Sequence, residues 1–177
     1  MPDDLDKVIA CLRFLGLHPQ MRVYRWRFLT QKIIFLAKAL GMDIGYDFTI
    51  YVAGPYSRQL NCDYYLDEIK TKIDNLQTDC VLADLDRSVL EKIRDCQGLL
   101  ENQSLMEAAS TAVYFMKQDP EISEDNLFVN LKRLKPHIGD ADRVVGITKA
   151  KELLFKQEYL TEEIKREIDE WDKAEGQ

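Results

Sequence analysis

Hydrophobic residues recur at helical spacing in two runs near the start of the chain. They lie three or four positions apart within residues 5–15 and again within residues 21–40, which predicts two helices with one apolar face each. Gly16 and Gly41 follow these runs at the position where a helix favours a left-handed cap. The first part of the chain is therefore expected to be helical.

A short stretch with a different period comes next. Phe48, Ile50 and Val52 alternate with other residues, as expected for a strand. Gly54 and Pro55 then interrupt the pattern. Because the fixed φ of proline suits the first turn of a helix, Pro55 is predicted to begin a helix that runs to about residue 76.

Helical patterns fill most of the remaining chain. Ser88 with Glu91, and Ser104 with Glu107, match the capping box and predict two helix starts. Gly146 falls within another helical run, where it is expected to cost about 1 kcal/mol.

The last predicted helix carries a narrow apolar stripe. Thr161 is placed to cap it, and Ile164, Ile168 and Trp171 recur at intervals of four and three residues. The stripe is a candidate interface, and two occupants stay open: the body of the same chain, or a second copy in a homodimer.

The predicted fold class is mainly α, a multi-helix domain with a small strand or winged-helix-like element around residues 46–53. The 177 residues are expected to form a single domain, 1–177, because no long linker or repeat divides them. Charge nevertheless differs between its halves. Residues 1–77 carry 10 basic and 9 acidic side chains, and residues 78–177 carry 14 and 22.

Composition favours an ordinary cytoplasmic protein. Cys11, Cys62, Cys80 and Cys96 form no paired motif, so all four are expected to be buried free thiols, and neither a metal nor a cofactor is predicted. No leader pattern and no apolar run approaching 18 residues is present, so no membrane association is expected.

Catalytic signatures are largely missing. The chain has two histidines, His18 and His137, each beside a proline at a predicted joint, and surface or capping roles are favoured over a general base. No nucleophile or phosphate-loop motif is recognisable, and no catalytic residue is proposed.

The joint between strand and helix is the first candidate site. If a helix began at Pro55, its free amide groups would attract a phosphate or a partner's carboxylate, reinforced by Ser57 and Arg58. The predicted anion- or partner-binding residues are Gly54, Pro55, Tyr56, Ser57 and Arg58. The alternative is that Ser57 only caps its own helix.

A basic face on the second helix is the other candidate. Arg22, Arg25, Lys32 and Lys38 fall in a stretch without acidic residues, close to aromatic side chains, and could contact a nucleic-acid backbone. The alternative is a solvated helix border that pairs with the acidic half. A sequence pI of about 4.9 disfavours non-specific DNA binding.

Several of these residues resemble the pattern of the YwgA-like family of uncharacterised prokaryotic proteins. The stretch RFLTQKIIFLAKALG followed by YDFTIYVAGPYSRQLNCDY carries the likeness. The matching positions are Gln31, Lys32, Tyr46, Phe48, Tyr51, Gly54, Pro55, Tyr56, Ser57, Leu60 and Asp63. SLMEAASTAVYFM and the Lys-Pro joint in NLKRLKPHI also look similar. More distantly, the order of elements resembles Panacea (SocA-like) antitoxin domains, which implies a winged-helix-like fold, protein contacts and no known catalytic residues.

These observations predict a non-enzymatic regulatory or adaptor module that binds another protein, with an antitoxin or defence role as one form. Two alternatives remain. One is a winged-helix-type nucleic-acid-binding regulator that uses the basic face. The other is an enzyme or nucleotide binder at the joint between Gly54 and Ser57.

Overall fold

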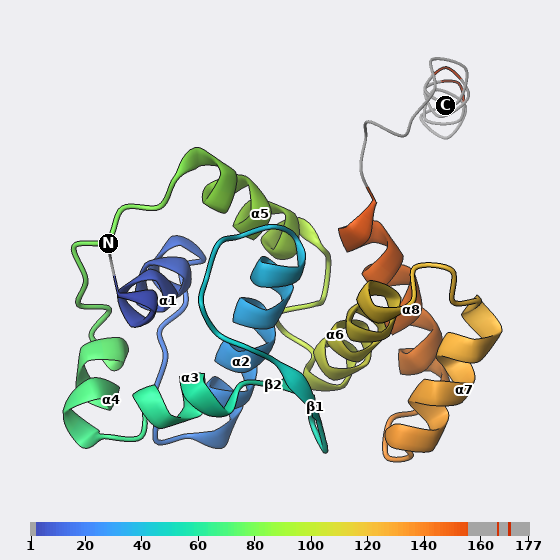
Figure 1. The fold of residues 1–177 in the computed structure, drawn as a ribbon, viewed down its shortest axis with the longest axis horizontal. Coiled ribbons are helices and arrows are strands. Elements are labelled where there is room, and N and C mark those ends of the chain that lie inside the picture. The colour runs from blue at the N-terminus through green and yellow to red at the C-terminus, as the bar shows by residue number, and fades with distance from the viewer. Residues whose placement is uncertain (1–2, 156–165, 167–169, 171–177) are drawn as a thin grey trace.

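The computed structural model describes residues 3–155, 166 and 170, and it is mainly helical. Figure 1 shows α2 in the middle, with α1, α3 and α4 to its left, α5 above it, and α6, α7 and α8 to its right. The helices in the described part are α1 (Asp4–Phe14), α2 (Tyr24–Ala39), α3 (Arg58–Asp63), α4 (Asp67–Asp74), α5 (Asp84–Asp95), α6 (Gln103–Gln118), α7 (Glu124–Leu134) and α8 (Asp140–Leu154).

The first two helices lie where the hydrophobic period predicts them. Asp3 caps α1 by accepting a hydrogen bond from the Leu5 amide. The apolar stripe of α2 is fully buried at Ile33 and Leu36, and one hydrophobic core includes side chains from both halves of the chain. Burial of one face explains why these two helices are stable.

The small sheet is an antiparallel hairpin. Its strands are β1 (Thr49–Tyr51) and β2 (Gly54–Tyr56), with Ile50 opposite Pro55. This confirms a mainly α fold with a small strand element, whereas the winged-helix comparison stays a prediction. The expected helix start at Pro55 is wrong, because Pro55 belongs to β2.

The helix predicted up to residue 76 is in fact two helices. Leu60 within α3 and Tyr64 directly after it are buried, and the chain turns at Tyr65 and Leu66 before α4 begins. Cys62 faces solvent on the outer side of α3, so the prediction that it is buried is wrong, while Cys11, Cys80 and Cys96 are buried free thiols.

Both predicted capping boxes are also wrong. Helix α5 begins at Asp84, so Ser88 lies inside it. Asn102 caps α6 by accepting from the Leu105 amide, and Ser104 therefore lies within the first turn. Neighbouring polar residues compete for a cap, and the contacts of the fold decide which one is used.

Helices α6 and α8 pack closely along much of their length. At Gly146 of α8, an added Cβ would come within 2.6 Å of the Ala108 Cβ on α6. The predicted cost of this glycine is thus outweighed by the close approach that it permits. No helix of the described residues is long and apolar enough to cross a membrane.

Candidate binding site at the hairpin

The strand-to-helix joint is closed by the protein's own groups. Ser57 is fully buried and precedes α3, and its hydroxyl oxygen accepts from the Leu60 amide at 3.2 Å. The Ser57 amide in turn donates to Gln31 Oε1 at 2.8 Å. The Ser57 and Leu60 amides therefore have partners within the protein, as the capping alternative expected, and Arg58 is the exposed residue of the joint.

Gln31 fixes the joint from α2. Besides accepting from Ser57, its Nε2 donates to the Ser57 carbonyl at 3.0 Å and to the Tyr64 hydroxyl at 2.9 Å. A single buried amide thus satisfies both backbone groups of one residue, as a neighbouring strand would do.

Two buried lysines hold the hairpin down. Lys32 Nζ donates to the Pro55 carbonyl at 2.6 Å, and Lys135 Nζ donates to the carbonyls of Tyr51 and Val52. Lys135 follows α7, so the hairpin is tied to both halves of the chain. Such charge-assisted bonds are stronger than neutral ones and fix the position of the turn.

Gly54 lets the hairpin pack closely against Lys32 and Thr111. Its φ is +93°, and an added Cβ would lie 2.9 Å from Thr111 Oγ1 and 3.4 Å from Lys32 Cε. Both the backbone conformation and the space require glycine here.

The buried carboxylate of Glu107 acts electrostatically on both lysines. Glu107 Oε1 lies 3.5 Å from Lys135 Nζ and 3.1 Å from His137 Nε2. Burial lowers the pKa of Lys32 to about 7, because Glu107 offsets only part of the desolvation and Lys135 adds to the shift. Burial also lowers the pKa of Lys135, against the opposing effect of Glu107. Basic groups therefore outnumber the carboxylate beneath the hairpin.

An aromatic groove opens beside this cluster, with a volume of about 230 Å³. We call it the tyrosine groove. It is lined by Tyr24, Arg27, Phe28, Gln31, Lys32, Tyr51, Val52, Ala53, Tyr56, Asn61 and Tyr64. The lining holds two cationic side chains and no acidic one.

The rim of the tyrosine groove is exposed and apolar. Val52 at the hairpin turn is 83% exposed, Tyr51 is 57% exposed and Tyr24 is 56% exposed. The rings of Tyr51 and Tyr56 lie 5.0 Å apart across the hairpin, and Lys32 Nζ lies 5.0 Å from the centre of the Phe28 ring. Large side chains thus face solvent from a hairpin whose backbone is held by buried hydrogen bonds.

The predicted basic face does not form one exposed surface. Lys32 is 2% exposed, and Lys38 donates to the Tyr46 carbonyl and lies beside Asp47. Arg22 pairs with Asp67 at 3.1 Å, and Arg25 reaches the Glu101 carbonyl at 3.5 Å. Lys32 therefore cannot belong to an exposed basic face with Arg22, Arg25 and Lys38, because it is buried beneath the hairpin.

Other residues of the sequence pattern meet in the structure. The Tyr46 hydroxyl donates to Asp63 Oδ2 at 2.7 Å, and Phe48 packs edge-on against Phe35 at 5.5 Å between ring centres. Together with the contacts of Gln31 and Lys32, these interactions connect the hairpin and the segment before it to α2 and α3.

Sequence reasoning missed the residues that the second half supplies. The sequence places Glu107 in a capping box and Lys135 in a Lys-Pro joint, and neither pattern predicts a contact near the hairpin. Both approach the hairpin from far along the chain, Lys135 from 84 residues beyond Tyr51. A lysine next to a helix-ending proline was the one available signal.

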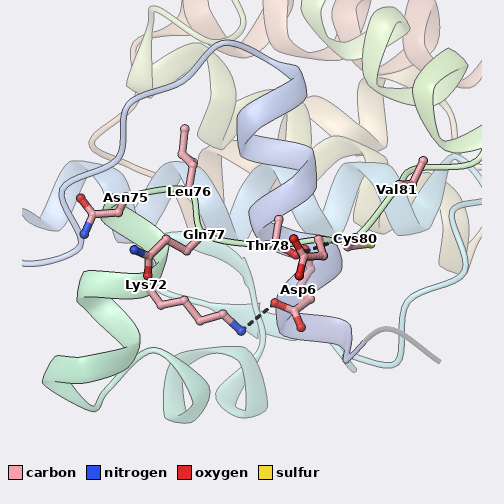
Figure 2. A pocket seen from close by; sticks show the side chains of 9 residues that line it. Asp6, Lys72, Asn75, Leu76, Gln77, Thr78, Cys80 and Val81 are labelled. Carbon is pink, nitrogen blue, oxygen red and sulfur yellow. Dashed lines mark hydrogen bonds and ion pairs between the residues drawn. The ribbon is translucent and has the colours of Figure 1, made fainter.

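A second hollow, of about 760 Å³, lies between α1, α4 and the segment that leads to α5. Figure 2 shows Lys72 reaching across it to Asp6, at 2.7 Å. The ion pair lowers the pKa of Asp6 and ties α4 to α1. No aromatic side chain is among the residues that line this hollow, so we place the candidate site at the tyrosine groove.

The predicted interface residues Ile164, Ile168 and Trp171 lie outside the described residues. Within the described part of the chain, no group of three His, Cys, Asp or Glu side chains is placed to hold a metal ion. Comparisons with protein-family models, curated proteins and solved structures give no match to this chain. The YwgA-like and Panacea resemblances stay predictions.

Proposed function

We propose that the protein is a regulatory or adaptor module that binds another protein through the rim of the tyrosine groove. The observation that carries the proposal is the exposure of Tyr24, Tyr51 and Val52 around the tyrosine groove, beside an anchored hairpin. Exposed aromatic side chains that border a pocket are typical of protein-binding surfaces.

The anchoring of the hairpin and of the joint that follows it supports the same proposal. The hairpin turn is anchored by Lys32 and Lys135, and the adjoining joint is anchored by Gln31. A surface that is already ordered loses little conformational entropy when a partner binds. An antitoxin or defence role is one form of such a module, in keeping with the resemblance.

Site-specific photo-crosslinking tests the proposal. A photoreactive amino acid replaces Val52 at the rim, and in a control protein it replaces Val129, a 59% exposed valine on α7. In extracts of the native host we expect a discrete crosslinked protein from position 52 and none from position 129. Equal crosslinking from both positions, or none from position 52, would contradict the proposal.

A further inference from the structure

The lining of the tyrosine groove includes two basic side chains, Arg27 and Lys32, and no acidic one. Arg27 Nη1 donates to the carbonyls of Met21 and Arg22, and no carboxylate among the described residues pairs with Arg27. Lys32 donates to one carbonyl and keeps further N–H donors. Glu107, the buried carboxylate nearby, is already engaged with Lys135 and His137.

Apolar walls surround these cations. Tyr24, Phe28, Tyr51 and Tyr56 supply aromatic surface within the same 230 Å³. The space is smaller than a typical site for a drug-sized ligand, so it suits a single residue or a similar group. Its occupant would therefore combine a negative charge and an apolar side chain within one residue.

We infer that the tyrosine groove binds the C-terminal residue of a partner protein, with its carboxylate toward Lys32 and Arg27 and its apolar side chain between the tyrosines. A C-terminal residue carries both groups on one Cα, whereas an aspartate or glutamate within a chain has no apolar side chain. The inference rests on the proposed function and specifies the part of the partner that enters the groove.

The charge of Lys32 makes recognition sensitive to pH. With its pKa lowered to about 7, the amine loses its proton in mildly alkaline solution, whereas a C-terminal carboxylate stays ionised above about pH 5. Carboxylate affinity should therefore fall as pH rises, by at most about tenfold per pH unit for one coupled proton. Other charged or titratable groups face this region from α2, β1, β2, α3 and the residue after it, α6 and the segment after α7. They are Tyr24, Arg27, Tyr51, Tyr56, Arg58, Cys62, Tyr64, Glu107, Lys135 and His137.

Two small probes test the inference on the full chain. N-acetyl-phenylalanine carries a free carboxylate, and N-acetyl-phenylalanine amide is its neutral match. Binding is followed by NMR through the backbone amide signals of Tyr51, Tyr56 and Asn61. At pH 6 we expect the acid to bind about tenfold more tightly than the amide, as for loss of one charged hydrogen-bonded contact.

The pH series needs no altered protein. Between pH 6 and pH 9 the affinity for the acid should fall about tenfold or more, and that for the amide should stay constant. The fall should persist in His137→Gln, which removes the imidazole on Glu107. A Lys32→Met protein that folds should lose the preference, and Lys132→Met, at an exposed lysine, should keep it.

Equal affinity for the two probes, a pH-independent preference, or shifts confined to other surfaces would overturn the inference. The proposed function has its own readout, since a crosslink from position 52 would survive failure of the probes. If the acid binds as expected but position 52 captures no protein, the protein partner is wrong and with it the inference.

Discussion

Gln31 is the residue on which the strand-to-helix joint most depends. Its amide satisfies the N–H and the C=O of buried Ser57 and also contacts the Tyr64 hydroxyl. Replacing it with leucine should cost about 1–3 kcal/mol for each buried group left without a partner. Gln59→Leu, at an exposed glutamine of α3, is the matched control. Chemical denaturation measures both, and equal stability of the two variants would contradict this role.

Lys32 should make stability depend on pH. Because burial lowers its pKa to about 7, the folded state binds fewer protons than the unfolded state from about pH 7 up to its ordinary value near 10.4. The contribution of Lys32 to the free energy of unfolding therefore rises with pH in that interval, by up to about 1.4 kcal/mol per unit.

Denaturation curves between about pH 7 and about pH 9 test this expectation. Lys32→Met should show a flatter pH dependence than the unaltered protein, and Lys132→Met should leave the slope unchanged. Parallel curves for all three proteins would show that Lys32 does not change its charge in this range.

At the scale of elements, the packing of α6 on α8 depends on Gly146. Its added Cβ would also lie 3.0 Å from the Ala109 amide nitrogen, so backbone as well as side chain blocks a larger residue. Gly146→Ala should lower the free energy of unfolding by about 1–3 kcal/mol despite the better helix propensity of alanine.

A double variant separates packing from propensity. Adding Ala108→Gly removes the nearest atom and should restore part of the lost stability, beyond the sum of the two single effects. A stabilised Gly146→Ala protein would instead mean that helix propensity decides at this position.

The elements differ in how far the sequence could predict them. The helical spacing of hydrophobic residues predicts α1 and α2, because each helix buries one apolar face in the core of the protein. Pro55 was misread because its strand pairing is fixed by Lys32 and Lys135, which come from elsewhere in the chain. The sequence does not predict the tyrosine groove, for the same reason. Its hairpin residues form a visible motif, but the burial of Lys32 is a tertiary effect that its charge does not suggest.

At the scale of the whole molecule, charge bears on the nucleic-acid alternative. The net charge is −7, and within the described residues the predicted basic face is divided between a buried lysine and side chains with partners of their own. We expect no gel shift of a short DNA duplex or RNA at about 50 mM salt, where phosphate contacts are strong. A shift that weakens steeply with added salt would instead favour the nucleic-acid alternative.

The proposal that a partner protein binds at the rim of the tyrosine groove has one most direct test. It is calorimetric titration of the protein identified by crosslinking, against Val52→Asp and the matched surface variant Val129→Asp. A charge at the exposed hairpin turn should weaken binding by more than about tenfold without unfolding the protein, as at other apolar hot spots. Val129→Asp should bind like the unaltered protein. Equal affinities for the two variants would contradict the account.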